Sequence, residues 1–467
     1  MKKVIFLLLD GARNDALESH INNGSMPNLK SIIDDGGSFS TAVTVFPSTT
    51  GPAYIPFISG VFPGISNMPG IRWFDKVKFS KNINSLDSHR SYVGIEGLMF
   101  NRDIKKSQPT IFEIIPNSRS IFNEITRGLK SSFDLTKLSK GYYKLKSHFS
   151  GSQVIDDLAF KKLLESINSD AQFTFCCFLG VDSNSHISGY NSKQVFNSYV
   201  NFDNKLGSII KELKDLNQFS DTLMLITSDH GHSNTSNHIE LVDILDEAGF
   251  KVLSYPKIYK KYLGRIDAAV MVSGNSMSHI YLRKDNDWGK NYTYKDSEGL
   301  VDKLLSYEGI DIVMTRNEKG QIVIKSKRGM ALLEDKETGL MYTPLLNDPF
   351  GYNGIMDYLT YDEVLDLTFD TLYPDSLTQI VQIFKSARCG DIVISAETGY
   401  DLRRDFELPE HKSSHGSLKR DHMHVPLIMN KKVPISRIRT VDLFPTILDF
   451  LSLPCSTKID GKKLDIY

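Results

Sequence analysis

The chain has 467 residues, more than one ordinary hydrophobic core contains, so we expect two domains or one large domain with an insertion. Hydrophobic residues make up 40% of the chain and charged residues 24%, as in a typical soluble globular protein. The formal net charge of -1 excludes a global positive field, so a nucleic-acid polymer is not an expected partner.

The first apolar run covers residues 4–9 and ends at Asp10. It is too short to span a membrane and lacks a small-residue cleavage site, so we interpret it as a buried strand. The cysteines form no Cys-x-x-Cys pair, and adjacent cysteines are poorly placed for a mutual disulfide. We therefore expect reduced, buried thiols and a cytoplasmic protein without a transmembrane segment. The cysteines are Cys176, Cys177, Cys389 and Cys455.

Strands and helices alternate in the first half of the chain. This order predicts an α/β fold with a mainly parallel sheet that is covered by helices on both faces. Strands are predicted at 4–9, at 42–45 and in the apolar runs that begin at Phe173 and Thr222, and helices at 25–36, 195–216 and 238–248.

The pattern changes near residue 250. We expect a smaller inserted α+β or cap region at 251–385, between the first part of the core at 1–250 and its final part at 386–467. Strands are predicted at 277–282 and 321–325 in the insertion and at 391–396 and 424–429 in the final part, with helices at 300–307 and 440–451.

A basic segment at 119–146 lies within 110–150, which we interpret as a possible helical insertion in the core. Its lysines and arginines alternate with aromatic residues. Contact with an anionic substrate or a lipid surface is one interpretation, and the solvated face of a helical hairpin is the other. The second is favoured, because charge runs are commonly just surface.

Three apolar runs lead to aspartates, Asp10, Asp182 and Asp229. Open parallel sheets bind ligands beyond the carboxyl ends of their strands, so we expect these carboxylates at one edge. His186 follows Asp182 by one helical turn, and His230 is adjacent to Asp229. Carboxylates and imidazoles together suit a divalent transition metal, with Zn²⁺ the leading choice and Mn²⁺ possible.

His415 precedes a predicted strand and can return to the same crevice. The set then offers six ligands, enough for two ions that stabilise the attacking and leaving oxygens of an in-line displacement. An isolated Asp–His pair is more often structural than metal-binding. The joint occurrence of all these groups predicts a metal-dependent enzyme.

Thr50 is the candidate nucleophile, with Ser48 and Thr49 as near rivals. It precedes Gly51-Pro52, and proline suits the first turn of a helix, where backbone N–H groups attract a phosphoryl group. A metal ion lowers the pKa of a bound hydroxyl, which then attacks phosphorus near neutral pH. A helix N-cap is the alternative role for a threonine here.

These residues resemble the alkaline phosphatase superfamily, and within it the type I phosphodiesterases and nucleotide pyrophosphatases. The resemblance spans nearly the whole chain, in the order of the family. The matching pieces are Leu-Leu-Leu-Asp10-Gly-Ala-Arg13, Met-Pro-Asn-Leu29, Phe-Pro-Ser-Thr-Thr50, Asp182-x-x-x-His186, Ser-Asp229-His230-Gly, His415-Gly-Ser, Thr440-Val-Asp-Leu-Phe-Pro-Thr446 and Ile459-Asp-Gly461.

The resemblance implies a metal ligand set in two parts and a covalent phospho-threonine intermediate that water hydrolyses. One ion would be held by Asp182, His186 and His415. The other would be held by Asp10, Asp229 and His230, with Thr50 bridging the two ions as the nucleophile.

The chain departs from the family after the nucleophile, where Gly51-Pro52-Ala53-Tyr54 replaces the usual Phe-Pro-Asn-His. Asn67 is our candidate for the asparagine that holds a phosphoryl oxygen, with a structural turn as the alternative. Arg72 is a candidate phosphate contact, and Trp73 could stack on a base or serve packing.

Four further histidines lie near the motifs. His232 is interpreted as a residue that orients a metal ligand, although it could be merely a polar neighbour of the site. We predict that His411, His422 and His424 are not ligands.

The leading hypothesis is hydrolysis of a phosphodiester or pyrophosphate in a small phosphate-containing substrate. A phosphomonoesterase, a phosphonate hydrolase or a phosphosugar mutase of the same superfamily is the alternative, although mutases generally use serine rather than threonine. A catalytically silent binding protein with this fold is the hypothesis from another class.

Overall fold

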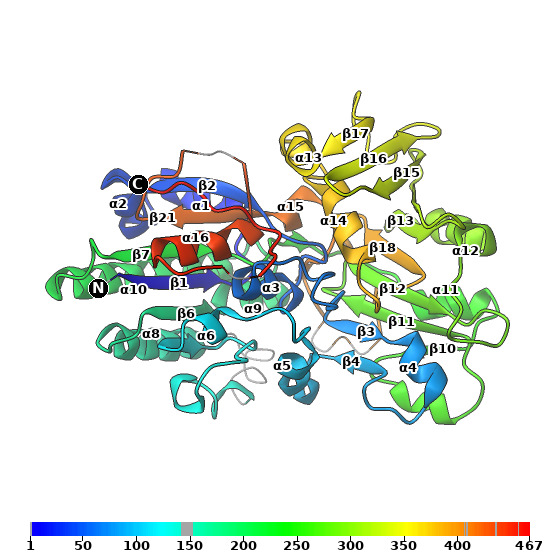
Figure 1. Ribbon diagram of the computed structural model, residues 1–467, viewed down its shortest axis with the longest axis horizontal. Coiled ribbons are helices and arrows are strands. Elements are labelled where there is room, and N and C mark those ends of the chain that lie inside the picture. Colours follow the sequence, from blue (N-terminus) through cyan, green and yellow to red (C-terminus); the bar gives the residue numbers. More distant parts are fainter. Residues whose placement is uncertain (1, 142–152, 406, 408–409, 435–436, 456) are drawn as a thin grey trace.

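The structure is a computed structural model that describes residues 2–141, 153–405, 407, 410–434, 437–455 and 457–467. Two large sheets lie side by side, a seven-stranded sheet on the left of Figure 1 and a nine-stranded sheet on the right. The predicted α/β class is confirmed, and so is the separate mixed region that accompanies the core.

The core sheet has the strand order β22-β2-β21-β7-β1-β6-β5. β1 pairs in parallel with both β6 and β7, and β5 extends the parallel part, whereas β21 runs antiparallel to its neighbours. The sheet is therefore mixed but parallel at its centre. Its strands are β1 (Lys3–Leu9), β2 (Ser38–Val43), β5 (Ser118–Ile121), β6 (Phe173–Phe178), β7 (Thr222–Thr227), β21 (His424–Met429) and β22 (Ile438–Arg439).

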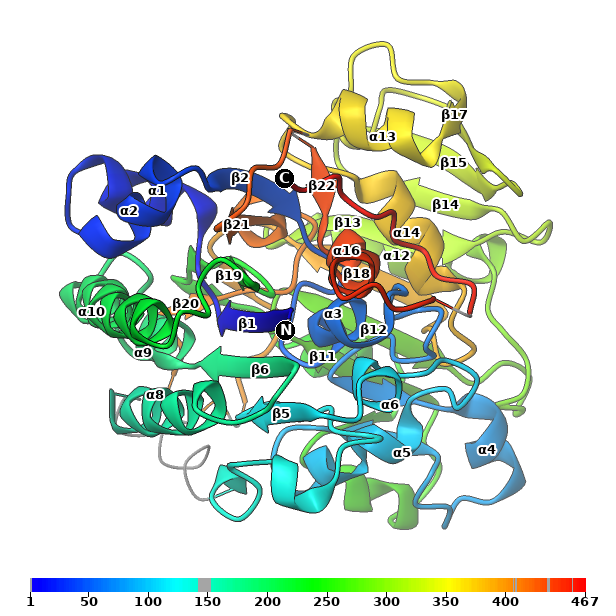
Figure 2. The same ribbon diagram turned by 60° about the vertical axis from the view of Figure 1, so that its left-hand side comes forward.

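The central strands consist largely of apolar residues, and β1, β6 and β7 are buried throughout. Continuous burial is typical of parallel strands that helices cover on both faces. Helices α8, α9 and α10 lie on one side of these strands, and α3, α6 and α16 on the other (Figure 2). The core helices are α1 (Asn14–Asn22), α2 (Pro27–Asp34), α3 (Ile55–Ser59), α6 (Ile111–Ile114), α8 (Gln153–Ile167), α9 (Gly180–Ser188), α10 (Lys193–Asp215), α15 (Arg420–Met423) and α16 (Leu443–Phe450).

The second sheet has the order β10-β11-β12-β18-β13-β14-β15-β16-β17 and is antiparallel except for the pair β10–β11. Its strands are β10 (Val252–Ser254), β11 (Ala268–Ser273), β12 (Met277–Leu282), β13 (Ile310–Arg316), β14 (Ile322–Lys325), β15 (Met330–Asp335), β16 (Gly339–Pro344), β17 (Asp357–Thr360) and β18 (Ile392–Ala396). Helices of this region and its surroundings are α4 (Lys76–Lys81), α5 (Phe100–Asp103), α11 (Leu241–Glu247), α12 (Tyr294–Ser306), α13 (Tyr361–Thr368) and α14 (Ser376–Phe384).

The placement of β18 corrects the expectation that residues 391–396 return to the core sheet. β18 pairs with β12 and β13 in the second sheet. A short run of buried apolar residues forms a strand in either sheet, so its sequence does not say which neighbours it takes. The core itself resumes with β21. The domain boundaries predicted above stay predictions.

The segment at 110–150 is also different from the predicted helical insertion. Its described part contains the edge strand β5 of the core sheet and only short helical turns. Three of the basic residues described there form ion pairs, Arg119 with Asp170, Arg127 with Glu113 and Lys140 with Asp134. Lys137 donates to the hydroxyl of Ser131, and Lys130 lies over the ring of Phe133. Residues 142–152, which include Lys144 and Lys146, lie outside the described residues.

The four cysteines are free thiols, as expected, and Cys176 and Cys177 are buried in β6. Cys389 is only partly buried and Cys455 is exposed, so the prediction of a buried thiol is wrong at Cys455. Within the part of the chain that the structure describes, no helix has both the length and the apolar character that a bilayer crossing demands.

Candidate metal centre

The register of the three central strands places three aspartates at one edge of the sheet. Leu9 of β1 lies opposite Phe178 of β6, and Leu8 lies opposite Thr227 of β7. Asp10 follows β1 directly, and Asp229 stands two residues beyond Thr227. Asp182 lies in the first turn of α9, which begins just after β6. The strand ends therefore deliver all three carboxylates to the same crevice.

One group of side chains, which we call site A, consists of Asp182, His186, His232 and His415. Oδ1 of Asp182 is 3.3 Å from Nε2 of His186, 2.8 Å from Nε2 of His232 and 3.9 Å from Nε2 of His415. Asp182 and His186 share one face of α9 because they are four residues apart. Three imidazole nitrogens and one carboxylate oxygen form a donor set suited to Zn²⁺.

The imidazoles of site A are held by hydrogen bonds on their other nitrogen. Nδ1 of His186 lies 2.8 Å from the carbonyl oxygen of Ser413, and Nδ1 of His415 lies 3.0 Å from that of Ser48. Nδ1 of His232 lies 3.1 Å from Oγ of Ser413. A proton on Nδ1 leaves the lone pair of Nε2 for a metal ion, so these contacts orient each ring for coordination.

His415 reaches site A through long-range strand pairing. The short strand β20 (Ser413–Ser414) pairs with β8 (Ser233–Asn234), so the residues that flank the two strands, His415 and His232, come together. An isolated bridge between Asn275 and His415 fixes the other side. The positions of these residues in the sequence do not predict that the two short strands pair.

A second group, site B, consists of Asp10, Asp229, His230 and the hydroxyl of Thr50. Nε2 of His230 is 3.6 Å from Oδ1 of Asp10 and 3.4 Å from Oδ2 of Asp229. Asp10, Asp182 and His230 also offer donor atoms within 4.8 Å of one another, so Asp182 lies between the two sites.

A carboxylate oxygen of Asp229 without a hydrogen-bond donor in the described part of the chain indicates whether site B fits a cation. Asp229 is fully buried, and its Oδ2 has no hydrogen-bond partner among the described residues. Its other oxygen, Oδ1, accepts a hydrogen bond from the backbone N–H of Gly11 at 3.3 Å. A buried carboxylate oxygen without a donor is costly, and a divalent cation would compensate it. The residues of site B therefore fit a metal ion.

The hydroxyl of Thr50 points into site B. Its Oγ1 lies 3.1 Å from Nε2 of His230 and 3.3 Å from Oδ1 of Asp10. Its neighbour Ser48 is turned away, because its hydroxyl donates to the carbonyl of Ser417 at 2.9 Å. Tyr54, which the sequence did not mark, donates its hydroxyl proton to Oδ2 of Asp10 at 3.1 Å. Thr50 is thus the hydroxyl next to the candidate metal-binding groups of site B.

Gly11 allows the two sites to approach each other. It has a φ of +73°, and a β-carbon there would lie 2.8 Å from Nε2 of His232 and 2.9 Å from Cβ of Asp182. Any other residue would be strained and would push into site A.

Burial and neighbouring charges shift the pKa values in both sites. Burial opposes ionisation of Asp182, yet His186 and His232 hold the pKa of this carboxyl well below its usual range. Burial lowers the pKa of His232 to about 3, despite Asp182, so its ring stays neutral. In site B, burial raises the pKa of Asp229 against the effect of His230.

Two residues predicted to contact the substrate, Asn67 and Trp73, form hydrogen bonds with residues outside sites A and B. Asn67 adopts a φ of 61°, and its Oδ1 accepts a hydrogen bond from Ser386 at 2.8 Å, an arrangement typical of a turn. Trp73 is fully buried and donates to the hydroxyl of Tyr92, which corrects the idea that it stacks on a base.

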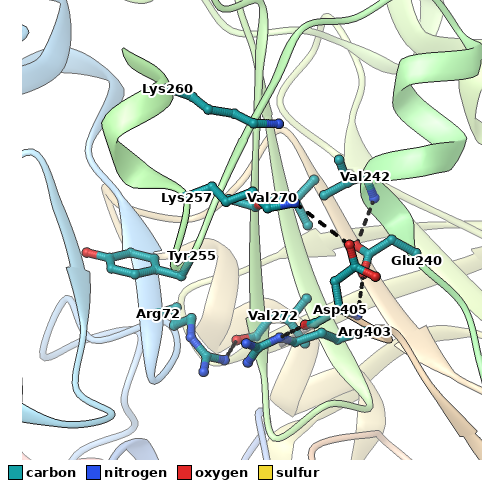
Figure 3. Close-up of a pocket in the computed structure, with 11 residues that line it drawn as sticks. Arg72, Glu240, Val242, Tyr255, Lys257, Lys260, Val270, Val272, Arg403 and Asp405 are labelled. Carbon is teal, nitrogen blue, oxygen red and sulfur yellow. Dashed lines mark hydrogen bonds and ion pairs between the residues drawn. The ribbon is translucent and has the colours of Figure 1, made fainter. Parts of the chain in front are cut away.

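Arg72 lines a pocket whose other polar residues include Arg403, Tyr255, Lys257, Lys260 and the carboxylates Glu240 and Asp405 (Figure 3). Its guanidinium donates to Ser91 and to the carbonyl of Val272, and among the described residues no carboxylate pairs with it. Burial and the nearby Arg403 lower the pKa of Arg72 to about 9.

The three histidines predicted as non-ligands have other contacts. His422 lies between Ser233 and Ser417, and Nε2 of His424 lies 3.1 Å from the carbonyl of Phe369. The ring of His411 lies 4.1 Å from that of His186, next to site A.

The family model of type I phosphodiesterases and nucleotide pyrophosphatases matches residues 4–418. The chain belongs to this family. The match includes all the residues of sites A and B, and it places the protein in the alkaline phosphatase superfamily, as the motifs indicated. A search of curated proteins found no match.

Solved structures of two other proteins share the fold. Murine ectonucleotide pyrophosphatase/phosphodiesterase 5, an inactive threonine-to-alanine variant in complex with AMP, is 15% identical with a TM-score of 0.59, over 99% of this chain and 98% of that chain. Phosphonoacetate hydrolase from Sinorhizobium meliloti 1021 in complex with phosphonoformate is 17% identical with a TM-score of 0.57, over 96% of this chain and 95% of that chain.

Proposed function

We propose that this family member hydrolyses a phosphodiester or pyrophosphate bond through a covalent phospho-threonine at Thr50. The observation that carries the proposal is the position of the Thr50 hydroxyl, 3.1 Å from Nε2 of His230 and 3.3 Å from Oδ1 of Asp10. A hydroxyl beside a buried group of metal-binding side chains is the arrangement that activates an alcohol as a nucleophile.

The residues of the two sites have separate roles in the proposed reaction. Asp10, Asp229 and His230 would hold one ion, and Asp182, His186 and His415 with the added His232 would hold the other. Two bound divalent ions lower the pKa of a hydroxyl or water and neutralise charge on the attacking and leaving oxygens. Thr50 attacks phosphorus and releases the leaving group, and a water molecule then cleaves the phospho-threonine. Tyr54 and Gly11 keep Asp10 and Asp229 in place through their hydrogen bonds.

The relatives support this proposal. The murine relative is inactive with alanine in place of a threonine and is in complex with AMP, which agrees with a threonine nucleophile and a nucleotide-like substrate. Zn²⁺ is our choice for site A because of its three imidazoles, and Mn²⁺ is the alternative. A cytoplasmic location stays our proposal from the reduced cysteines.

A second candidate function has its own observation. The pocket with Arg72 and Arg403 places two guanidinium groups side by side, and Arg72 lacks a carboxylate partner among the described residues (Figure 3). A buried cation without a counter-charge favours an anionic ligand. Val272, which accepts from Arg72, is two residues from Gly274, so their Cα atoms are at most ~7 Å apart. A β-carbon on Gly274 would touch His415.

The pocket therefore neighbours site A and suits a substrate with a second anionic group, such as a phosphonate that carries a carboxylate. The phosphonoacetate hydrolase that shares the fold is in complex with a compound of this class.

A substrate panel with the Zn²⁺-loaded and the Mn²⁺-loaded protein tests the proposal. It compares bis-nitrophenyl phosphate, nitrophenyl thymidine monophosphate, nitrophenyl phosphate, nitrophenyl phenylphosphonate and phosphonoacetate by kcat/KM. We expect the two diesters to react fastest, and acid quenching followed by mass spectrometry to show phosphate on the peptide that contains Thr50. A preference for the monoester would contradict the diesterase proposal, and no metal together with no cleavage would favour the silent binding protein.

The second candidate has a matched pair of variants. Arg72→Met should lower kcat/KM for phosphonoacetate about 10-fold or more, the usual cost of a lost charged hydrogen bond, and leave bis-nitrophenyl phosphate unchanged. Arg404→Gln is the control, because Arg404 is exposed and pairs with Asp243 outside the pocket. Equal effects of Arg72→Met on both substrates would remove the support for an anionic leaving group.

A further inference from the structure

A third cluster of metal-ligating side chains, which we call site C, lies outside sites A and B. It consists of His238, Asp401 and Glu407, whose donor atoms lie within 4.8 Å of one another. Nε2 of His238 is 2.9 Å from Oε2 of Glu407 and 3.8 Å from Oδ2 of Asp401. The pairing of β9 (Asn237–His238) with β19 (Tyr400–Asp401) sets His238 directly opposite Asp401.

Two carboxylates are buried together in site C. Asp401 is fully buried and Glu407 is 8% exposed. Burial and the charge of Glu407 raise the pKa of Asp401 to about 7. The amide of Asn275 donates to Oδ2 of Asp401 at 3.2 Å and to Oε1 of Glu407, and Thr235 donates to Oδ1 of Asp401. These neutral donors solvate the carboxylates without neutralising their charge.

The atoms that face the centre of the cluster are unsatisfied. Oε2 of Glu407 and Nε2 of His238 are both buried and, among the described residues, neither makes a hydrogen bond. They nevertheless face each other at 2.9 Å. Buried polar atoms are almost always hydrogen-bonded, so two that converge without a hydrogen bond point to a ligand that both atoms contact.

We propose that site C binds a third divalent cation through Nε2 of His238, a carboxylate oxygen of Asp401 and Oε2 of Glu407. One imidazole and two carboxylates, with a position left for water, form a donor set that Zn²⁺ accepts and that also suits Mn²⁺. The two carboxylates together balance the charge of a divalent ion, which removes the cost of burying them as a pair.

Site C is connected to the reaction centre without being part of it. Nδ1 of His411 lies 3.1 Å from Oε1 of Glu407, and the ring of His411 lies 4.1 Å from that of His186 in site A. A cation that fixes Glu407 therefore positions His411 against a ligand of site A. The ion at site C would position residues and would take no part in bond breaking.

The test counts metal ions in the full-length protein. The purified chain is saturated with Zn²⁺, and in a parallel sample with Mn²⁺, desalted and analysed by inductively coupled plasma mass spectrometry. We expect His238→Ala and Glu407→Gln each to contain one ion fewer per chain than the wild type. His20→Ala is the matched control, because His20 is a half-buried histidine of α1 outside all three sites, and it should retain the wild-type content.

Equal metal contents in the wild type, His238→Ala and Glu407→Gln would overturn the proposal and show that the cluster shares a proton instead. Anomalous diffraction from wild-type crystals at the zinc edge is a second measurement that needs no variant. A peak among His238, Asp401 and Glu407 supports site C, and a peak at sites A and B alone refutes it. Both readouts are independent of turnover, so they hold whichever substrate the enzyme uses.

Discussion

Sites A and B lie next to each other but differ in composition and origin. Site A has one carboxylate and three imidazoles, and its residues come from α9 and two loops that pair through β8 and β20. Site B has two carboxylates, one imidazole and a hydroxyl, and its aspartates follow the neighbouring strands β1 and β7. The side chains of Asp229 and His230 are fully buried, whereas those of Asp182 and His186 are 19% and 15% exposed.

The difference has a chemical consequence. With a divalent ion, site A keeps a net positive charge, whereas the two carboxylates of site B neutralise theirs. Nitrogen-rich sites favour Zn²⁺, and oxygen-rich sites also accept harder ions such as Mn²⁺. We infer that site A is the more selective metal site and that site B holds the nucleophile.

The largest expected effect is the loss of the nucleophile in site B. Thr50→Ala should lower kcat on the order of 1,000-fold or more and leave the metal content unchanged, because the aspartates and His230 remain. Steady-state kinetics with metal analysis on the same sample checks both statements. Thr49→Ala is the control, because Thr49 is buried beside Thr50 and its backbone groups bond to Pro47 and Ala53 and not to site B. A similar loss in Thr49→Ala would move the nucleophile to that residue.

Substitution of Gly11 by alanine should disturb site A, because the added methyl group displaces the side chains of His232 and Asp182. A methyl group at Gly11 would meet His232 and Asp182 at 2.8 and 2.9 Å, so Gly11→Ala should reduce the metal content and the activity together. Gly24→Ala separates this clash from backbone strain, because Gly24 also has a positive φ but has nothing within 4 Å of the added carbon. Gly24→Ala should cost only about 1–2 kcal/mol of stability. Equal loss of metal in both variants would mean that strain, and not the clash, is responsible.

His232 sharpens the comparison because its contribution to site A can be measured. If His232 supplies a donor atom or orients Asp182, His232→Gln should weaken metal binding at site A about 10–100-fold. Competition with a chromophoric chelator measures this affinity, and site B should retain its ion. His20→Gln serves as the control, since His20 lies in α1 and belongs to neither site. Unchanged affinity would leave His232 as a polar neighbour of the site.

The smallest expected effect is the pH dependence of metal binding at site A. Burial disfavours the imidazolium of His186, yet Asp182 raises its pKa above the usual 6.5. A protonated imidazole cannot bind a metal, so a raised pKa means that protons compete with the ion at a higher pH than for an ordinary histidine. We expect site A to lose its ion before site B as the pH falls from 8 towards 6. Dialysis over a pH series with metal analysis follows the loss, and simultaneous release from both sites would contradict the order.

The sequence predicted the central strands well because their physics is local. Strands that are buried on both faces appear as continuous apolar runs, as in β1, β6 and β7, and β1 ends directly before the polar Asp10. The edge strand β5 was missed because it has only four residues, Ser118–Ile121, three of them polar. β18 was given to the wrong sheet, since its apolar residues would suit either sheet.

The sequence alone determined the family, the α/β class and the set of carboxylates and imidazoles at strand ends, because these depend on residue type and short-range order. Only the tertiary structure decided that His232 joins His415 beside Asp182, that Tyr54 contacts Asp10, and that His238 meets Asp401 and Glu407. Pairings between distant short strands create the first and the third of these contacts, β8 with β20 for His232 and His415, and β9 with β19 for His238 and Asp401. Strands of two residues leave almost no pattern in a sequence, so their partners are fixed by the packing of the whole chain.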